Sequence, residues 1–401
     1  MPANPYSLNR TVIPSFQETR RSWLPAAKML LSKAESLAHR RPAAYDVIVF
    51  GGGPAGAAVA LALARRGHSV AIFRKRSDVA PPIGETVPPG IARPLAQLGL
   101  WDQFRAAGHA EAPGTVVIWG GECPYENDFV FNPYGPSWHL DRAHFDTMLI
   151  AAAEAAGAEI SDCRVNGCVR QPGAGWNVLI DDNHGGRIVA ARWLVDATGR
   201  AAWLARRLFA KRYRMDRLVA FVKFARCEVV DESRTLIEAC PVGWWYAATL
   251  PQRRVVKALF TDADLLPRSA SDRVRLWRTT LAATSLISKT SPDPDGASAI
   301  HIVAAYSGRL MPCAGRDWLA VGDAAQVYDP LTGQGIAKAL TSALRGAEAI
   351  SASLLQDRFA LNDFVSTAAR EYEDYAIDQV ACYRREQRWS RHEFWKRRNL
   401  S

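Results

Sequence analysis

The sequence predicts an α/β protein in which a doubly wound, mostly parallel sheet carries an inserted antiparallel sheet and ends in a helical tail. Three observations predict this arrangement. A buried apolar run near residue 45 leads through a glycine-rich turn into a helix, a second buried run returns at residues 318–321, and alternating aromatic-rich segments lie between them. The 401-residue chain is too long for one typical core, so we expect two or three packed units.

The first strand–turn–helix–strand unit begins the parallel sheet. Residues 47–50 form a short apolar run, as expected for a strand buried on both faces. Residues 51–56 form the turn, residues 57–66 a helix that ends at Gly67, and residues 70–73 the second strand. Such a unit is the usual start of a doubly wound sheet.

The middle of the chain has a different pattern. Residues 115–119, 217–227, 243–250 and 255–261 alternate and are rich in aromatic and β-branched side chains. The last two segments flank residues 251–254, Pro-Gln-Arg-Arg, which indicates a hairpin. We therefore expect an antiparallel sheet that forms a second, substrate-binding domain.

The domains predicted from these patterns are discontinuous. The cofactor domain takes residues 45–80, 136–210 and 300–355, the substrate domain 81–135 and 211–299, and helical regions take 1–44 and 356–401. In the first 44 residues, apolar side chains recur at helical spacing, which predicts an amphipathic helix at about 25–40 that docks on the body. This pattern fits an export signal poorly, because charged residues and a proline interrupt it.

The turn of the first unit, Gly51-Gly52-Gly53-Pro54-Ala55-Gly56, satisfies G-x-G-x-x-G between a strand and a helix. Gly51 permits the tight turn, Gly53 lets backbone approach a pyrophosphate, and Gly56 lets the helix pack on the strand. The helix N-terminus attracts the negative charge. In this context the pattern predicts a dinucleotide cofactor.

The acidic residue that usually ends the second strand and binds a ribose hydroxyl is missing. Its place holds Arg74, followed by Lys75 and Arg76. Arg74 could bind a 2′-phosphate, stack on adenine or remain solvated. What replaces the acid is left open by the sequence.

Two further segments indicate which dinucleotide binds. Residues 195–200, Val-Asp-Ala-Thr-Gly-Arg, end one strand, and residues 318–325 end another before leading into Gly333-Gln334-Gly335. With the glycine-rich turn, these segments resemble the FAD-dependent monooxygenase and halogenase superfamily, the glutathione-reductase-like flavoproteins. The resemblance implies a Rossmann-like FAD-binding domain. It also implies that Asp323 binds the flavin ribityl chain and that the following glycines present amides to the isoalloxazine edge.

Two more segments match that superfamily. Residues 84–89 resemble the G-E segment beside the flavin, and residues 140–146 the segment whose arginine, here Arg142, approaches the cofactor. Glu85 is either a general base or a helix-capping carboxylate, and Arg142 could instead form an ion pair with a neighbouring aspartate. The expected cofactor-binding residues are therefore Gly51, Gly53, Pro54, Ala55, Gly56, Arg74, Arg142, Gly199, Gly322, Asp323, Pro330, Gly333, Gln334 and Gly335.

Within the superfamily, the chain most resembles the flavoproteins that mature quinone cofactors in lysine ε-oxidase, glycine oxidase and quinohemoprotein amine dehydrogenase. The stretches that carry this resemblance are residues 83–101, 243–246 with 260–264, 322–335, and 383–389 with 394–395. Members of that group act on a tryptophan side chain of a partner polypeptide. The resemblance makes Glu85, Trp245 and Tyr246 the candidate catalytic residues, whereas ordinary packing on a sheet face is the alternative for the two aromatic residues.

The sequence and its resemblances predict an FAD-dependent monooxygenase that uses NAD(P)H and dioxygen. A flavin C4a-hydroperoxide would hydroxylate an aromatic substrate, and the narrower resemblance suggests a peptidyl tryptophan in a precursor polypeptide. The alternatives are an FAD-dependent reductase of a lipid or prenyl chain and a non-catalytic FAD-binding maturation partner. A flavin-dependent halogenase is disfavoured, because residues 88–94 lack the lysine that halogenases need there.

Composition excludes several other classes. The formal net charge of +10 is concentrated in residues 1–44 and 384–401, which argues against a nucleic-acid-binding groove in the body. Residues 47–64 are uncharged but hold four glycines and a proline, so no membrane span is predicted. The seven cysteines contain no C-x-x-C pair and the eight histidines no metal-ligand spacing, which predicts no metal site and a cytoplasmic location.

Overall fold

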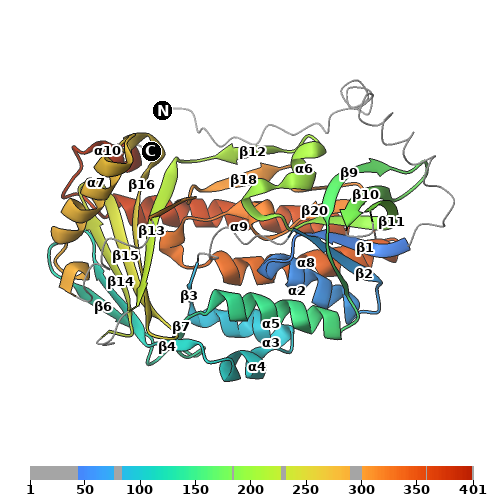
Figure 1. The fold of residues 1–401 in the computed structure, drawn as a ribbon, viewed down its shortest axis with the longest axis horizontal. Coiled ribbons are helices and arrows are strands. Elements are labelled where there is room, and N and C mark those ends of the chain that lie inside the picture. Colours follow the sequence, from blue (N-terminus) through green and yellow to red (C-terminus); the bar gives the residue numbers. More distant parts are fainter. Residues whose placement is uncertain are drawn as a thin grey trace.

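The computed structural model describes residues 44–75, 84–182, 185–226, 232–289, 300–357 and 359–399. The helix expected at residues 25–40 lies outside them. In Figure 1 a sheet with helices packed below it fills the right half, and a second sheet stands at the left. Long C-terminal helices connect the two halves. The expected α/β fold with two sheets and a helical tail is confirmed.

The first sheet has eight strands and the order β19-β20-β11-β1-β2-β8, with β10 and β9 added beside β11. Strands β20, β11, β1, β2 and β8 run parallel. The strands are β1 (Ala44–Phe50), β2 (Val70–Arg74), β8 (Glu159–Asp162), β9 (Arg164–Arg170), β10 (Trp176–Asp182), β11 (Gly185–Asp196), β19 (Ala314–Gly315) and β20 (Trp318–Ala320). This sheet confirms the predicted, mostly parallel first sheet.

Three helices pack together beside the first sheet: α2 (Pro54–Ala64), α5 (Arg142–Ala155) and α8 (Gly335–Leu354). Helix α2 lies between the other two and buries nine of its eleven residues, because alanine and valine cover nearly its whole circumference. It begins at Pro54, whose missing N–H costs nothing at the first helical position.

The second sheet has seven strands in the order β17-β13-β16-β15-β14-β5-β6. They are β5 (Gly114–Ile118), β6 (Tyr125–Asp128), β13 (Leu218–Arg226), β14 (Thr235–Cys240), β15 (Gly243–Leu250), β16 (Arg254–Asp262) and β17 (His301–Ala304). The expectation of a purely antiparallel sheet is wrong at one pair, since β14 runs parallel to β5. These two strands are far apart in the chain, so no tight turn forces them to be antiparallel.

The predicted hairpin joins β15 to β16. Leu250 and Arg254 are paired, and Gln252 and Arg253 between them both have left-handed backbone angles, with φ of 62° and 56°. Successive left-handed residues produce the twist that suits a tight hairpin. The turn forms although it lacks the glycine or asparagine that usually marks such turns.

Neighbouring residues of β15 face opposite sides of the second sheet, because side chains alternate along a strand. Trp244 packs with Phe260 and Tyr383 on one face. Trp245 packs on the other face against Trp277 of α7 (Ala270–Ala282). The two faces therefore belong to separate hydrophobic cores.

The C-terminal helices join the two halves. In α9 (Ala360–Arg384), Phe364 belongs to the core of the first sheet and Tyr383 to that of the second. Helix α10 (Glu393–Asn399) buries Phe394 and Trp395 in the second core.

Short elements complete the structure around the junction. They are β3 (Thr86–Val87), β4 (Ala110–Ala112), β7 (Ser137–His139), β12 (Lys211–Arg214), β18 (Gly308–Met311), β21 (Gln326–Val327), α3 (Ala92–Gln97), α4 (Trp101–Ala106) and α6 (Trp203–Arg207). Within the described ranges, no helix combines the length and apolar character that crossing a membrane requires.

The glycine turn tolerates no side chain at Gly56. A Cβ there would lie 1.9 Å from the carbonyl oxygen of Gly51, and backbone cannot move away as a flexible side chain can. We expect Gly56→Ala to lower the free energy of unfolding by about 1–3 kcal/mol. Urea unfolding measures this loss. Gly121→Ala is the control, because nothing lies within 4 Å of its missing Cβ; equal stability of the two variants would contradict the prediction.

Candidate functional site

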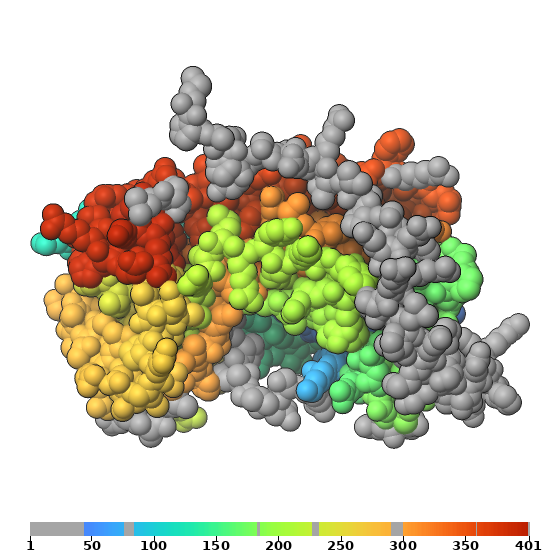
Figure 2. Space-filling model, turned by 90° about the horizontal axis from the view of Figure 1, so that it is seen from above, coloured from blue at the N-terminus to red at the C-terminus, as the bar shows by residue number. Residues whose placement is uncertain are grey.

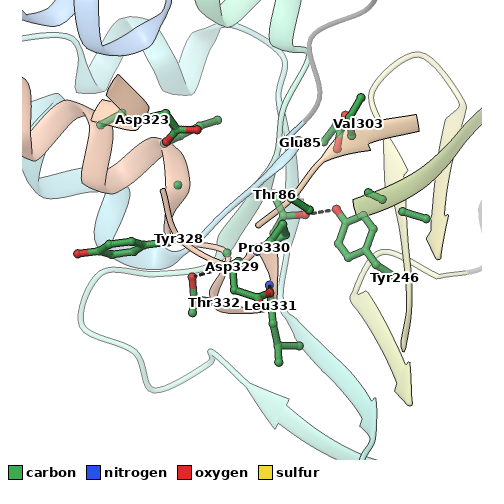
Figure 3. Close-up of a pocket in the computed structure, with 18 of the residues that line it drawn as sticks. Glu85, Thr86, Tyr246, Val303, Asp323, Tyr328, Asp329, Pro330, Leu331 and Thr332 are labelled. Carbon is green, nitrogen blue, oxygen red and sulfur yellow. Dashed lines mark hydrogen bonds between the residues drawn. The ribbon is translucent and has the colours of Figure 1, made fainter. Parts of the chain in front are cut away.

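A cavity of about 560 Å³ lies where the first sheet meets the second. One wall comes from the carboxyl ends of the parallel strands and the N-termini of α2 and α8, and the opposite wall is the Trp244 face of the second sheet. Figure 3 shows the Tyr246 side chain of the second sheet pointing toward the Thr86 side chain. The surface is hollowed between the yellow and orange part and the green part of Figure 2.

The glycine turn forms a cradle at one end of the cavity. Gly53 precedes α2 and lines the cavity with Pro54 and Ala55, and nothing lies within 4 Å of the missing Cβ of Gly53. Gly51 and Gly56 do not line the cavity. Gly51 has a φ of +105°, and a Cβ there would lie 2.4 Å from a backbone oxygen, so these two glycines serve the turn and the helix packing.

A cluster of charges lies beside this cradle. Asp323, which follows β20, accepts a hydrogen bond from the Lys338 Nζ at 3.0 Å and pairs with Arg200 at 3.5 Å. The Arg212 guanidinium donates to the backbone oxygens of Asp323 and Ala324. Burial acts to raise the pKa of Asp323, but Lys338, Arg200 and Arg212 together hold it below its usual range.

This cluster carries more positive than negative charge. Buried nitrogens of Arg200 and Arg212 have no hydrogen-bond partner in the protein, although buried polar groups are normally paired. Arg200 lines the cavity, so a diphosphate or the hydroxyls of a ribityl chain would supply an acceptor for its Nε. The open cradle at Gly53 and this orphaned nitrogen therefore fit FAD. The sequence did not predict roles for Arg200, Arg212 or Lys338. The one sequence feature that marks Lys338 is its position on α8, three residues after Gly335.

Two of the remaining expected cofactor residues form ion pairs. Arg74 does not line the cavity; its Nε donates to Asp162 at 2.7 Å, and its side chain lies against Gly52. Arg142 lines the cavity and also makes a two-pronged ion pair with Asp146, at 3.2 and 3.1 Å. Arg142 therefore forms an ion pair with a neighbouring aspartate and also lies in the site.

The segment that follows Asp323 forms the floor of the cavity. Among the expected cofactor-binding residues, the cavity is lined by Gly199, Pro330, Gly333 and Gly335 but not by Gly322 or Gln334. Gly322 has a φ of +59°, and a Cβ there would lie 2.7 Å from the Cβ of a residue of α2, so it serves packing.

Asp329, in the same segment, is a buried residue that was not expected from the sequence to belong to the site. Its carboxylate accepts hydrogen bonds from Gln379 and Tyr383 of α9, each at 2.9 Å, and from the backbone N–H of Leu331 at 2.9 Å. Burial, with the nearby charge of Asp216, raises the pKa of Asp329 to about 6. The Asp-Pro pair in the sequence signalled a turn but not these contacts.

Glu85 is buried at the junction of the two walls. Its Oε1 has no hydrogen-bond partner. Burial raises its pKa, and the opposing charges of Arg142 and Arg254 do not cancel that effect. The helix-capping interpretation is wrong, because the residue precedes β3 and caps no helix.

The structure separates the two aromatic candidates. Tyr246 lines the cavity, and its hydroxyl shares a hydrogen bond of 2.5 Å with the Thr86 hydroxyl (Figure 3). Trp245 points to the opposite face of the sheet, so its expected place beside the substrate is wrong. Trp244 takes that place instead, stacked on Phe260 with ring centroids 3.9 Å apart. Because side chains alternate along a strand, the sequence predicts that Trp244 and Trp245 face opposite sides of the sheet. It does not show which of these sides faces the cofactor site.

Residues 44–358 match the FAD binding domain family. The chain belongs to this family. It is therefore an FAD-dependent oxidoreductase of the flavin-dependent monooxygenase and halogenase superfamily, and the fit of the cradle and the charge cluster to FAD agrees with that. Among the described residues, no group of histidine, cysteine and acidic side chains could hold a metal ion.

Three relatives illustrate the range of this flavoprotein family. The putative FAD-dependent oxidoreductase LodB of Marinomonas mediterranea is 32% identical over 88% of this chain and 97% of its own length. The peptidyl tryptophan dihydroxylase QhpG, essential for tryptophylquinone cofactor biogenesis, is 26% identical, with a TM-score of 0.73 over 89% of this chain and 79% of its own. The myxobacterial chondrochloren halogenase CndH shares the fold, with 24% identity and a TM-score of 0.81 over 90% and 87%.

Removing the Asp323 carboxylate from this flavoprotein would leave Lys338, Arg200 and Arg212 without their counter-charge and the cofactor without an acceptor. We expect Asp323→Ala to weaken FAD binding by at least about tenfold, which corresponds to ~1.4 kcal/mol. Fluorescence titration of the apoprotein with FAD measures the loss. Asp272→Ala, at the start of α7, is the control and should bind FAD as the unaltered protein does; unchanged affinity in Asp323→Ala would refute its role.

Proposed function

We propose that this flavoprotein hydroxylates the indole ring of a tryptophan residue within a partner polypeptide. One observation carries the proposal: a single cavity joins the cradle that fits FAD to the aromatic face of the second sheet. An aromatic substrate in this cavity would touch both walls.

The chain's own contribution begins with the aromatic wall. Trp244 and Phe260 form a stacked pair, and both line the cavity with Val256 and Ala258. Planar aromatic surfaces favour offset or edge-on packing with another ring, so this wall can orient an indole while excluding water. FAD, when bound and reduced, would supply the activation of dioxygen.

Glu85 is the proton acceptor that we propose for the substrate. Hydroxylation of an aromatic carbon replaces its hydrogen, and that proton must leave for the ring to regain aromaticity. The unpartnered Oε1 of Glu85 is available for it, and the raised pKa makes this carboxylate a stronger base than an ordinary glutamate. The hydroxyls of Thr86 and Tyr246 would hold the polar edge of the substrate.

One relative supports a polypeptide substrate. QhpG is a peptidyl tryptophan dihydroxylase and is 26% identical over 89% of this chain. The cavity also lies between the two halves of the molecule, where an extended segment of a partner could enter.

Halogenation is the competing proposal, because several relatives are halogenases. Within the part of the chain that the structure describes, no lysine lines the cavity. Arg93, the basic residue of the segment after Glu85, stacks on Tyr134 at 5.6 Å and does not line the cavity either. A guanidinium stays charged and cannot act as a neutral nucleophile. The cavity therefore favours oxygen transfer.

Peptide hydroxylation is tested by mass spectrometry of tryptophan-containing peptides after incubation with the holoenzyme, NADH or NADPH, oxygen and bromide. We expect a mass gain of one or two oxygen atoms on tryptophan, and consumption of the nicotinamide cofactor that we propose as electron donor. A bromine mass shift would establish the halogenase alternative. Substrate reduction without oxygen uptake would favour a reductase, and no turnover at all a non-catalytic maturation partner.

Glu85→Gln tests the proton acceptor. Only the ionised carboxylate accepts a proton, so we expect kcat of the unaltered enzyme to fall as the pH drops through the raised pKa of Glu85. Glu85→Gln should lower kcat by roughly 10²-fold and remove this acidic limb, since the amide does not titrate. The pH profile of kcat is the measurement.

Glu111→Gln on the exposed side of β4 is the matched control and should keep the profile of the unaltered enzyme. An acidic limb that survives in Glu85→Gln would assign the titration to another group.

A further inference from the structure

Aromatic side chains form a continuous line from the cavity to the protein surface. The indole N–H of Trp244, in the cavity wall, donates to the Tyr383 hydroxyl at 2.9 Å. The Tyr383 ring centroid lies 5.7 Å from that of Trp119 and 6.0 Å from that of Trp395. Trp395 in turn lies 6.2 Å from Trp389, which is half-buried at the surface.

A proton acceptor stands at the second position of this line. The Tyr383 hydroxyl donates to the Asp329 Oδ2 at 2.9 Å, and both groups are buried. Burial and the Asp329 charge raise the pKa of Tyr383, so the phenol keeps its proton at rest, whereas Asp329, with a pKa of about 6, is ionised at neutral pH. A phenol hydrogen-bonded to a carboxylate can lose an electron while its proton moves to that carboxylate.

The surrounding charges favour this coupled step over simple electron loss. The Arg398 guanidinium lies 5.0 Å from the Tyr383 ring centroid, and it would repel a tyrosine radical cation. Transfer of the phenol proton to Asp329 leaves a neutral radical instead, which Arg398 does not destabilise in this way.

We propose that Trp244, Tyr383, Trp395 and Trp389, with Trp119 as a parallel member, form an electron-transfer path from the cavity to the surface. The path would draw one-electron oxidising equivalents out of the cavity when oxygen activation is not followed by substrate hydroxylation. The inference rests on the oxygen chemistry of the proposed function but not on the identity of the substrate.

The electrons and protons balance as follows. Superoxide in the cavity takes one electron from Trp244 and two protons from water and becomes hydrogen peroxide. Tyr383 returns an electron to Trp244 while its phenol proton moves to Asp329. Trp395 or Trp119 then reduces the tyrosyl radical, which takes its proton back from Asp329. Trp389 supplies the next electron and is itself reduced by a thiol or ascorbate in solution.

Oxidation mapping tests the path. The holoenzyme is reduced and reoxidised by oxygen repeatedly without substrate, with catalase present to remove released peroxide, and tryptophan oxidation is located by peptide mass spectrometry. We expect oxidation to concentrate at Trp389. In Tyr383→Phe, oxidation at Trp389 should fall several-fold and oxidation at Trp244 should rise.

Two further variants complete the comparison. Trp389→Phe changes only the surface end, and it should move oxidation inward to Trp395 and Trp244. Trp245→Phe is the matched control, because Trp245 is as buried as Trp244 but contacts Trp277 on the other face of the sheet. It should leave the oxidation pattern as in the unaltered protein.

A light-driven experiment separates failure of the path from failure of the proposed function. Illuminated FAD oxidises neighbouring aromatic residues without oxygen, so the holoenzyme is irradiated anaerobically with a nitroso spin trap in solution. Adducts at Trp389 that decrease several-fold in Tyr383→Phe would support the path even if no peptide is hydroxylated. Equal labelling of Trp389 in the unaltered protein, Tyr383→Phe and Trp245→Phe, in both experiments, would overturn it.

Discussion

Close approach of backbone segments at the carboxyl ends of β1, β11 and β20 is the constraint on which the site depends. Gly56 brings α2 against the turn that follows β1, and Gly51 brings that turn against the backbone of Ala197 after β11. Gly322 brings the turn after β20 against α2. At each of these contacts, a Cβ in place of the glycine hydrogen would lie less than 3.0 Å from a neighbouring atom, which is closer than side chains tolerate. Because the helix N-terminus, Gly53 and Asp323 are all positioned by these contacts, a cofactor cradle and a charge cluster arise side by side from segments almost 270 residues apart.

Two buried aspartates near this junction are stabilised in opposite ways. Three cations surround Asp323 and lower its pKa, so it stays ionised beside the cofactor site. Asp329 has only neutral hydrogen-bond donors, and burial raises its pKa to about 6. Two of its donors, Gln379 and Tyr383, come from α9, so this carboxylate also fastens the C-terminal helix to the cavity floor. An unpaired buried charge is costly, which explains why so many donors converge on it.

The sequence predicted the local structure and the roles of residues that lie close together in the chain. It did not predict which residues of distant segments meet in the fold. The glycine turn was readable because its three glycines meet steric demands within six residues. The partners of Asp323 were not, because Arg200, Arg212 and Lys338 come from three separate elements. Trp245 was chosen over Trp244 for a related reason: alternation shows that the two face opposite sides, but only the packing of α7 against the Trp245 face shows which side is left for the cavity. The parallel pairing of β14 with β5 likewise depends on a long connection that no local pattern encodes.

Fold likeness alone does not decide between hydroxylation and halogenation, since relatives of both kinds share this architecture. The decision rests with the side chains of the cavity wall. A hydroxylase needs a surface that orients an aromatic ring, excludes water and accepts one proton; Trp244, Phe260 and Glu85 meet these needs. In the proposed function, the same wall would place an oxidisable indole next to oxygen chemistry. A ring suited to holding the substrate would then be exposed to the oxidant intended for it, and the hydrogen bond from Trp244 to Tyr383 would give that ring an electron donor on its protected side.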